Sequence, residues 1–206
     1  MGEQHTIFVV EDDPPVLNST CRLLQSAGFW PKGYASAEAF LDDYDPDQSG
    51  CLVLDIYLEG MNGLKLQARL KQEQITVPVV FVSAYGRIPM VVDAMKAGAI
   101  GFLEKPFHEQ EFFDLIRFGL ERDEIRRLQR RREQDVKQRQ AALTAREIEV
   151  MEECLRGKST KQIALDLGIS PKTVDKHKVR MLHKMGVENP VELAWLYFGR
   201  SERVPD

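Results

Sequence analysis

The chain of 206 residues contains no long uncharged run. No apolar stretch approaches the roughly 20 residues that a membrane-spanning helix needs, and residues 1–11 lack the pattern of a signal peptide. Cysteine is also scarce, because only Cys21, Cys51 and Cys154 are present and they lie far apart. An odd, scattered set of cysteines predicts neither a disulfide framework nor a clustered zinc site. We therefore expect a cytoplasmic protein with reduced thiols and no membrane partner.

Charge is distributed unevenly along the chain. Residues 1–120 contain nine Lys/Arg and 17 Asp/Glu (net −8), residues 121–140 contain eight and five (net +3), and residues 141–206 contain eleven and ten (net +1). This asymmetry predicts two domains with different partners. We place a first domain at 1–122, a helical linker at 123–140 and a second domain at 141–206. The linker contains no Gly or Pro, which favours an exposed helix; a disordered charged segment is the alternative.

The first domain alternates short uncharged runs with helical patterns. Such runs are typical of strands that are buried on both faces, as parallel strands between helices are. We place four of them near residues 6–10, 51–54, 78–83 and 99–103, and a further strand near 28–34, which contains Lys32. Strands that alternate with helices predict an α/β fold, a doubly wound, flavodoxin-like sheet of five parallel strands.

Polar side chains stand where the predicted strands end. In chain order they are Asp12, Asp13, Asp55, Ser83 and Lys105. Because the carboxyl ends of parallel strands form the ligand-binding edge of such a sheet, we expect these side chains to meet. Carboxylates that lie close together repel each other unless a cation is present, and Mg²⁺ bound through oxygens relieves the repulsion. Such an ion beside a lysine and a hydroxyl also suits an incoming phosphoryl group.

Residues 5–122 resemble the receiver domain of two-component response regulators. The resemblance is carried by Asp12, Asp13, Asp55, Ser83, Phe102 and the Lys105-Pro106 pair. It implies that Asp55 accepts a phosphoryl group from a sensor histidine kinase and that the peptide bond before Pro106 is cis. It further implies that Asp12, Asp13, Asp55 and the backbone carbonyl of Tyr57 bind Mg²⁺. Leu58-Glu59 is a departure, because the family usually has Met-Pro there.

The resemblance also implies a switch. Phosphorylation adds negative charge and acceptor oxygens, which Ser83 and Lys105 would meet. Phe102 would then turn into the space that Ser83 vacates. Beyond Mg²⁺-dependent self-phosphorylation from a phosphodonor and autodephosphorylation, no enzyme activity is implied. The rival class is a Mg²⁺-dependent phosphohydrolase, but Tyr57 stands where such an enzyme usually has a second acid.

The second domain is expected to be an all-α module of four short helices. Capping boxes begin at Thr144 and at Ser159, and Gly168 turns the chain before a longer helix that ends near Met185. Asn189 and the proline after it begin a last, apolar helix. A glycine turn between the second and third helices is typical of a helix-turn-helix module.

Residues 141–200 resemble the LuxR-type helix-turn-helix, so the whole chain is similar to NarL/FixJ-type transcriptional regulators, with features that favour the FixJ branch. Independently, residues 172–184 carry five bases and one acid. We expect this helix to enter the major groove of double-stranded promoter DNA. The residues expected to contact DNA are Lys172, Thr173, Asp175, Lys176, Val179 and Arg180. We hypothesise that Asp175 accepts a hydrogen bond from cytosine N4; a merely repulsive charge is the alternative.

The last predicted helix, over residues 190–198, is more apolar than one face of a small helix requires. Exposed apolar patches usually mark interfaces, so we expect a homodimer to form on phosphorylation. A dimer would place two recognition helices about one turn of DNA apart. Release of a masked DNA-binding module is an open alternative, and a protein-binding scaffold that never binds DNA is the rival function. Family analogy favours an activator that contacts RNA polymerase.

Overall fold

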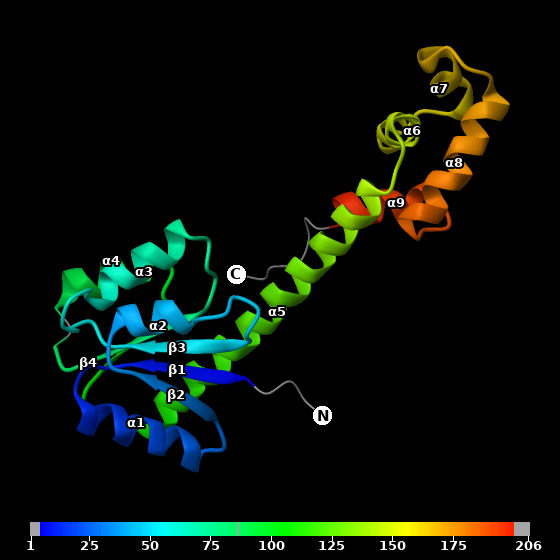
Figure 1. The fold of residues 1–206 in the computed structure, drawn as a ribbon. Helices are drawn as coiled ribbons and strands as arrows, with labels where there is room; N and C mark the ends of the chain where they lie inside the picture. The colour runs from blue at the N-terminus through cyan, green and yellow to red at the C-terminus, as the bar shows by residue number, and fades with distance from the viewer. Residues whose placement is uncertain (1–4, 86, 200–206) are drawn as a thin grey trace. The chain divides into compact units, whose positions relative to one another are not determined.

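The computed structural model describes residues 5–85 and 87–199 and is drawn in Figure 1. The chain divides into two compact units, Met1–Arg127 and Leu128–Asp206. Within the described residues, the structure contains no helix with both the length and the apolar character needed to cross a membrane. All three cysteines are free thiols, as their scattered positions predict.

The first unit is built on a parallel sheet. Its strands are β1 (Thr6–Val10), β2 (Trp30–Tyr34), β3 (Gly50–Leu54), β4 (Val79–Ser83) and β5 (Gly101–Glu104). The helices between them are α1 (Pro14–Ser26), α2 (Ala37–Asp43), α3 (Gly63–Gln72) and α4 (Ile88–Lys96), and α5 (Glu109–Ala141) follows the last strand. All strand pairs are parallel and the order is β2-β1-β3-β4-β5. The predicted doubly wound, five-stranded sheet is confirmed.

Helices cover both faces of this sheet, which explains why its central strands contain no charged residue. Successive side chains of a strand point to opposite faces, so neighbours such as Val80 and Phe81 belong to different cores. Phe81 packs in a cluster with Leu66 of α3, and Val80 packs in a cluster with Leu24 of α1 and Phe112 of α5. In Figure 1, α2, α3 and α4 lie on one side of the sheet and α1 lies on the other.

The second unit contains four helices after the end of α5. They are α6 (Ala145–Leu155), α7 (Thr160–Leu167), α8 (Pro171–Met185) and α9 (Pro190–Phe198). The capping boxes at Thr144 and Ser159 are both formed, and Gly168 ends α7 with a φ of 65°. A positive φ costs glycine little, so the chain turns sharply there and α8 begins three residues later. The predicted four-helix module is confirmed.

The charged segment at 121–140 is helical throughout, because it lies inside α5. The helical interpretation is therefore confirmed and the disordered alternative is wrong for these residues. The expectation that the segment is exposed throughout is also wrong, since Asp123 and Val136 are buried. Asp123 bonds within the first unit, whereas Val136 packs with Met181 in the core of the second unit. The domain boundaries at residues 122 and 140 stay a prediction.

Candidate phosphorylation site and nucleic-acid interface

Two acidic residues directly follow adjacent strands at matching positions in the strand register. β1 and β3 are paired so that Val10 lies opposite Leu54, and the next residues are Glu11 and Asp55. The ladder continues for one more step, because the Asp55 N–H donates to the Val10 carbonyl at 3.1 Å. Parallel pairing therefore brings these two carboxylates to the same edge of the sheet.

Asp55 is the centre of the hydrogen bonding at this edge. Its Oδ1 accepts from the Ser83 hydroxyl at 2.8 Å and from the Tyr57 N–H at 2.9 Å. Its Oδ2 accepts from Lys105 Nζ at 2.9 Å. Asp55 is 7% exposed and Ser83 is fully buried, so the carboxylate is held rigidly but remains in reach of solvent. The structure thus brings together Asp55, Ser83 and Lys105.

Lys105 lies between two carboxylates, with Nζ 2.5 Å from Glu11 Oε2 and 2.9 Å from Asp55 Oδ2. Burial acts to lower the pKa of Lys105, but the hydrogen bonds and charges of Glu11 and Asp55 outweigh it and raise that pKa above its usual value. Burial likewise raises the pKa of Glu11, although the ammonium of Lys105 opposes the shift. The lysine is therefore a fixed positive charge beside Asp55 Oδ2.

The structure separates the two predicted acids Asp12 and Asp13. Asp12 Oδ2 accepts from the Glu59 N–H at 2.8 Å, which ties it to the loop after β3. Asp13 instead caps α1, because its Oδ1 accepts from the Val16 N–H at 3.3 Å. The carboxylate that joins the Lys105 network is that of Glu11, which the sequence reasoning missed. Counting from the strand end would have found it, since Glu11 follows β1 directly as Asp55 follows β3.

The oxygen atoms of Asp12, Asp55 and the Tyr57 backbone are of the kind that binds Mg²⁺. Among residues 5–85 and 87–199, no three His, Cys, Asp or Glu side chains converge as a ready-made metal site. Mg²⁺ does not need such a cage, because it keeps several waters and uses one or two carboxylates. Tyr57 lines a hollow with Asp55 and a neighbouring hollow with Asp12. Asp12, Asp55 and the Tyr57 carbonyl are therefore a suitable donor set.

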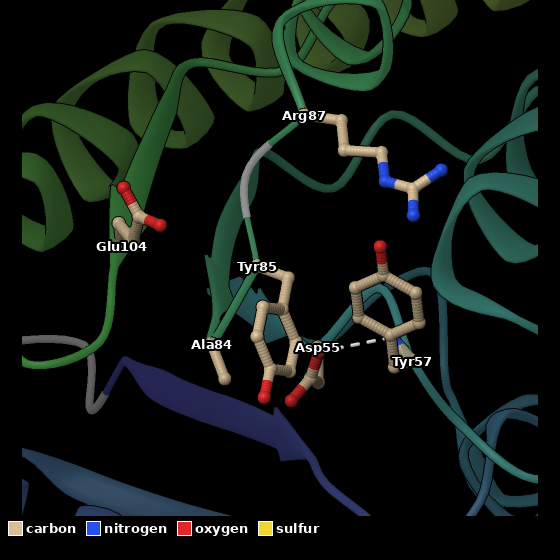
Figure 2. Close-up of a pocket in the computed structure, with 6 residues that line it drawn as sticks. All are labelled: Asp55, Tyr57, Ala84, Tyr85, Arg87 and Glu104. Atoms are coloured by element: carbon tan, nitrogen blue, oxygen red, sulfur yellow. Dashed lines mark hydrogen bonds between the residues drawn. The ribbon is translucent and has the colours of Figure 1, made fainter.

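An open hollow of about 680 Å³ leads to Asp55, and Figure 2 shows the residues that line it: Asp55, Tyr57, Ala84, Tyr85, Arg87 and Glu104. The rings of Tyr57 and Tyr85 meet edge to face, with centroids 6.2 Å apart. A small phosphodonor can enter here. The Lys105-Pro106 peptide bond nearby is cis, as the family resemblance implied. Phe102 is half-buried on β5, where it pairs in register with Phe81.

The predicted DNA-contacting residues lie on α8. Lys172, Asp175, Lys176, Val179 and Arg180 are exposed. Thr173 is the exception, because it is half-buried and its hydroxyl lies 2.8 Å from that of Ser170 at the helix N-terminus. Asp175 Oδ1 accepts from the Thr160 hydroxyl at 3.2 Å, a bond that links α8 to the first turn of α7. The exposed face therefore has three bases, one acid and one aliphatic side chain.

The chain matches known proteins over almost all of its length. Residues 7–117 match the response regulator receiver domain, and residues 141–197 match the bacterial regulatory proteins of the luxR family. Response regulator protein TodT of Pseudomonas putida is 37% identical over 200 residues, which cover 97% of this chain and 86% of TodT. Transcriptional regulatory protein FixJ of Bradyrhizobium diazoefficiens is 35% identical over 190 residues, which cover 92% of this chain and 93% of FixJ. The solved structure of response regulator StyR has a TM-score of 0.85 and 42% identity, and the match covers 94% of this chain and 98% of StyR.

A receiver sheet with a lysine-bound aspartate, followed by a helix-turn-helix module, defines the class of DNA-binding response regulators in two-component systems. The chain belongs to the NarL/FixJ family of these regulators. Its role is phosphorylation-dependent regulation of transcription rather than turnover of a metabolite, so the phosphohydrolase and scaffold alternatives are set aside.

Proposed function

We propose that a sensor histidine kinase phosphorylates this regulator on Asp55, and that phosphorylation promotes dimerisation and binding of α8 to promoter DNA. The observation that carries the proposal is the setting of Asp55. Its carboxylate is held by Ser83 and Lys105 at the end of a buried strand, and it lines an open hollow. A nucleophilic oxygen that is fixed in place and reachable from solvent is what phosphoryl transfer needs.

In the transfer, a carboxylate oxygen of Asp55 bonds to phosphorus while the bond from phosphorus to the histidine nitrogen of the kinase breaks. The imidazole keeps the electron pair. Lys105, which donates to Asp55 Oδ2, stays beside the phosphoryl oxygens as a positive charge. Bound Mg²⁺ would neutralise further charge on those oxygens, and we assign Asp12, Asp55 and the Tyr57 carbonyl as its ligands.

The same pocket supports two slower reactions, self-phosphorylation from a small phosphodonor and autodephosphorylation by water. Both need access to Asp55 from solvent, and the hollow beside Tyr57 and Tyr85 provides it. In autodephosphorylation, water attacks phosphorus and the Asp55 oxygen leaves with the electron pair. The two tyrosine rings flank the opening, so their position determines how easily water reaches the phosphoryl group.

Ser83 and Phe102 are proposed to transmit the phosphorylated state. The Ser83 hydroxyl donates to Asp55 Oδ1, so a phosphoryl group on Asp55 offers it new acceptor oxygens. Ser83 is expected to turn toward them and to leave space beside β5. Phe102, which is only half-buried, gains contacts by turning into that space. The signal then reaches the surface formed by α4, β5 and α5.

Activated protein is proposed to bind DNA as a homodimer and to act with RNA polymerase as an activator. Val191, Trp195 and Phe198 on α9 are 65%, 70% and 61% exposed, which is unusual for large apolar side chains that lie this close in sequence. A second copy that covers this surface would place two α8 helices on DNA half-sites. TodT and FixJ are named as a response regulator and a transcriptional regulatory protein, which supports a promoter as the target.

The test compares the purified wild type with Asp55→Asn in binding to genomic DNA fragments, with and without acetyl phosphate and Mg²⁺. The wild type is expected to bind selected fragments more tightly and to double in mass when the phosphodonor is added. Asp55→Asn is expected to show neither response, because the amide is a poor nucleophile. Equal binding by both proteins under both conditions would contradict the phosphorylation switch, and absence of any binding would contradict the DNA-binding role.

A further inference from the structure

We propose that Asp175 and Val179 determine which DNA sequence this regulator prefers. Asp175 accepts a hydrogen bond from the N4 amino group of a cytosine, and Val179 contacts the C5 methyl group of a thymine within about two base pairs of it. The inference rests on the proposed function, because it requires α8 to lie in the major groove. It deepens that function by naming the bases that the helix recognises.

The exposed face of α8 contains two kinds of side chain. Lys172, Lys176 and Arg180 are positively charged. Such residues can form ion pairs with phosphates whatever the DNA sequence. Asp175 and Val179 cannot, because phosphates repel a carboxylate and offer nothing to an aliphatic group. Along α8, Asp175 lies between Lys172 and Lys176, and Val179 follows Lys176 and precedes Arg180. Contacts with base edges would compensate for placing them against DNA.

Asp175 is held in position before DNA arrives. The Thr160 hydroxyl of α7 donates to its Oδ1 at 3.2 Å. A carboxylate has two oxygens, so one can be held by Thr160 while the other accepts from a base. In the major groove, only adenine and cytosine present amino donors. Adenine N7, an acceptor, lies directly beside its amino group and repels a carboxylate, so cytosine is the favoured partner.

Val179 is 68% exposed although it is aliphatic and lies on a helix that buries Val174, Met181 and Met185. The thymine methyl is the apolar group that the major groove offers. Asp175 and Val179 are four residues apart, which is about 6 Å along a helix axis. Successive bases of one strand are about 3.4 Å apart, so the two contacts span about two base-pair steps.

The first experiment identifies the site and then removes single groups from it. Phosphorylated full-length protein selects bound duplexes from a random DNA library, and the selected sequence is expected to contain the cytosine and thymine within about two steps of each other. Replacing that thymine by uracil removes only the methyl group and is expected to weaken wild-type binding about fourfold. Replacing the cytosine by an analogue without the 4-amino group is expected to weaken it roughly tenfold.

Variants of the protein test which side chain contacts the thymine methyl group and which contacts the cytosine amino group. Val179→Ala is expected to bind thymine and uracil duplexes equally, whereas the control Ile125→Ala, which shortens an aliphatic side chain of 50% exposure on α5, keeps the fourfold difference. Asp175→Asn is expected to prefer adenine over cytosine at the same position, because an amide can both donate to adenine N7 and accept from N6. The control Asp166→Asn makes the same charge change on exposed α7 and is expected to keep the cytosine preference.

Each outcome decides a different question. If Asp175→Asn binds every base at that position equally more tightly, Asp175 is only a repulsive charge and its proposed contact is wrong. If uracil weakens wild type and Val179→Ala alike, Val179 does not contact the methyl group. Either result leaves selection of duplexes by the wild type intact. If the wild type selects no duplex under any condition, the DNA-binding function itself fails.

Discussion

At the scale of single residues, the phosphorylation site depends on one lysine between two carboxylates. Glu11 and Asp55 are both buried, and Lys105 bridges them. Two neighbouring buried carboxylates are unfavourable without a cation, so this lysine stabilises the pair. The longer side chain of glutamate reaches Lys105 from the end of β1, while Asp12 stays on the loop side with the Glu59 N–H. Glu11 therefore shares the lysine with Asp55, whereas Asp12 lies outside the Lys105 network.

A buried carboxylate of the second unit predicts how that unit responds to acid. Glu147 Oε2 accepts from Lys184 Nζ at 2.7 Å and from the Thr144 N–H at 2.9 Å. These bonds, that of Lys184 first, lower the pKa of Glu147 from its usual 4.5. A carboxylate with a lowered pKa stabilises the fold above its unfolded pKa, and the stabilisation is lost as pH falls through the folded pKa. The second unit should lose this contribution below about pH 4.5.

Glu147→Gln is therefore expected to destabilise the second unit by about 2 kcal/mol at pH 7 and by much less at pH 3. Amide hydrogen exchange of peptides from α6 and α8, corrected for the intrinsic effect of pH, measures the difference. Glu149→Gln is the matched control, because that carboxylate is about half exposed in its pair with Arg146 and should contribute little at either pH. A Glu147→Gln effect that is the same at both pH values would contradict the assigned cause.

At the scale of elements, α5 is attached to the sheet by a buried charge. Asp123 Oδ2 accepts from the Ser49 hydroxyl at 2.8 Å, from the Gly50 N–H at 3.0 Å and from Arg127 Nε at 3.0 Å. Arg127 in turn donates to the backbone carbonyls of residues 46 and 47. The network lies where β3 begins, at the opposite end of that strand from Asp55. It fixes the stretch of α5 at which the first unit ends.

Asp123→Ala is expected to destabilise the first unit by about 3 kcal/mol, because it leaves the buried Gly50 N–H without its acceptor and the half-buried Arg127 without its opposite charge. Faster hydrogen exchange in peptides from β3 and from the first half of α5 would report the loss. Asp114→Ala on the same helix is the control. Its carboxylate and Arg117 are 61% and 57% exposed, so removing the pair should cost less than about 1 kcal/mol. Equal effects of the two variants would show that Asp123 is not an anchor.

The elements themselves could be predicted from the sequence because their signals are local. Uncharged runs predicted β1, β3, β4 and β5, and the capping boxes at Thr144 and Ser159 predicted where α6 and α7 begin. The Asp123 network could not be predicted, since it joins residues about 70 positions apart that pair only after the sheet forms. Asp13 was assigned to the pocket for a related reason. Three consecutive acids look alike in a sequence, and only the register of β1 with β3 decides which of them leaves the strand beside Asp55.

At the scale of the whole molecule, the distribution of charge favours DNA binding by the second unit and not by the first. Residues 1–120 have a net charge of −8, which disfavours contact with DNA, and the bases of α8 stand on the other unit. DNA binding should therefore depend on salt through contacts of basic residues outside the first domain, those on α8 among them. For double-stranded DNA, each neutralised phosphate contributes about −0.9 to the slope of log K against log salt concentration. The slope thus counts contacts per complex and can distinguish one bound copy from two.

Activation by dimerisation and activation by release of a masked module predict different slopes of log K against log salt concentration. If a dimer forms, acetyl phosphate and Mg²⁺ should increase affinity and double the slope, because a second α8 brings its own phosphate contacts. Lys172→Ala should then reduce the slope by about 1.8, twice the single-contact value, since the lysine is lost from both copies. Fluorescence anisotropy of a labelled duplex across a salt series measures both quantities, with Asp55→Asn as the control that cannot respond. Higher affinity with an unchanged slope would assign activation to release, because unmasking exposes the same single helix more often without adding a contact.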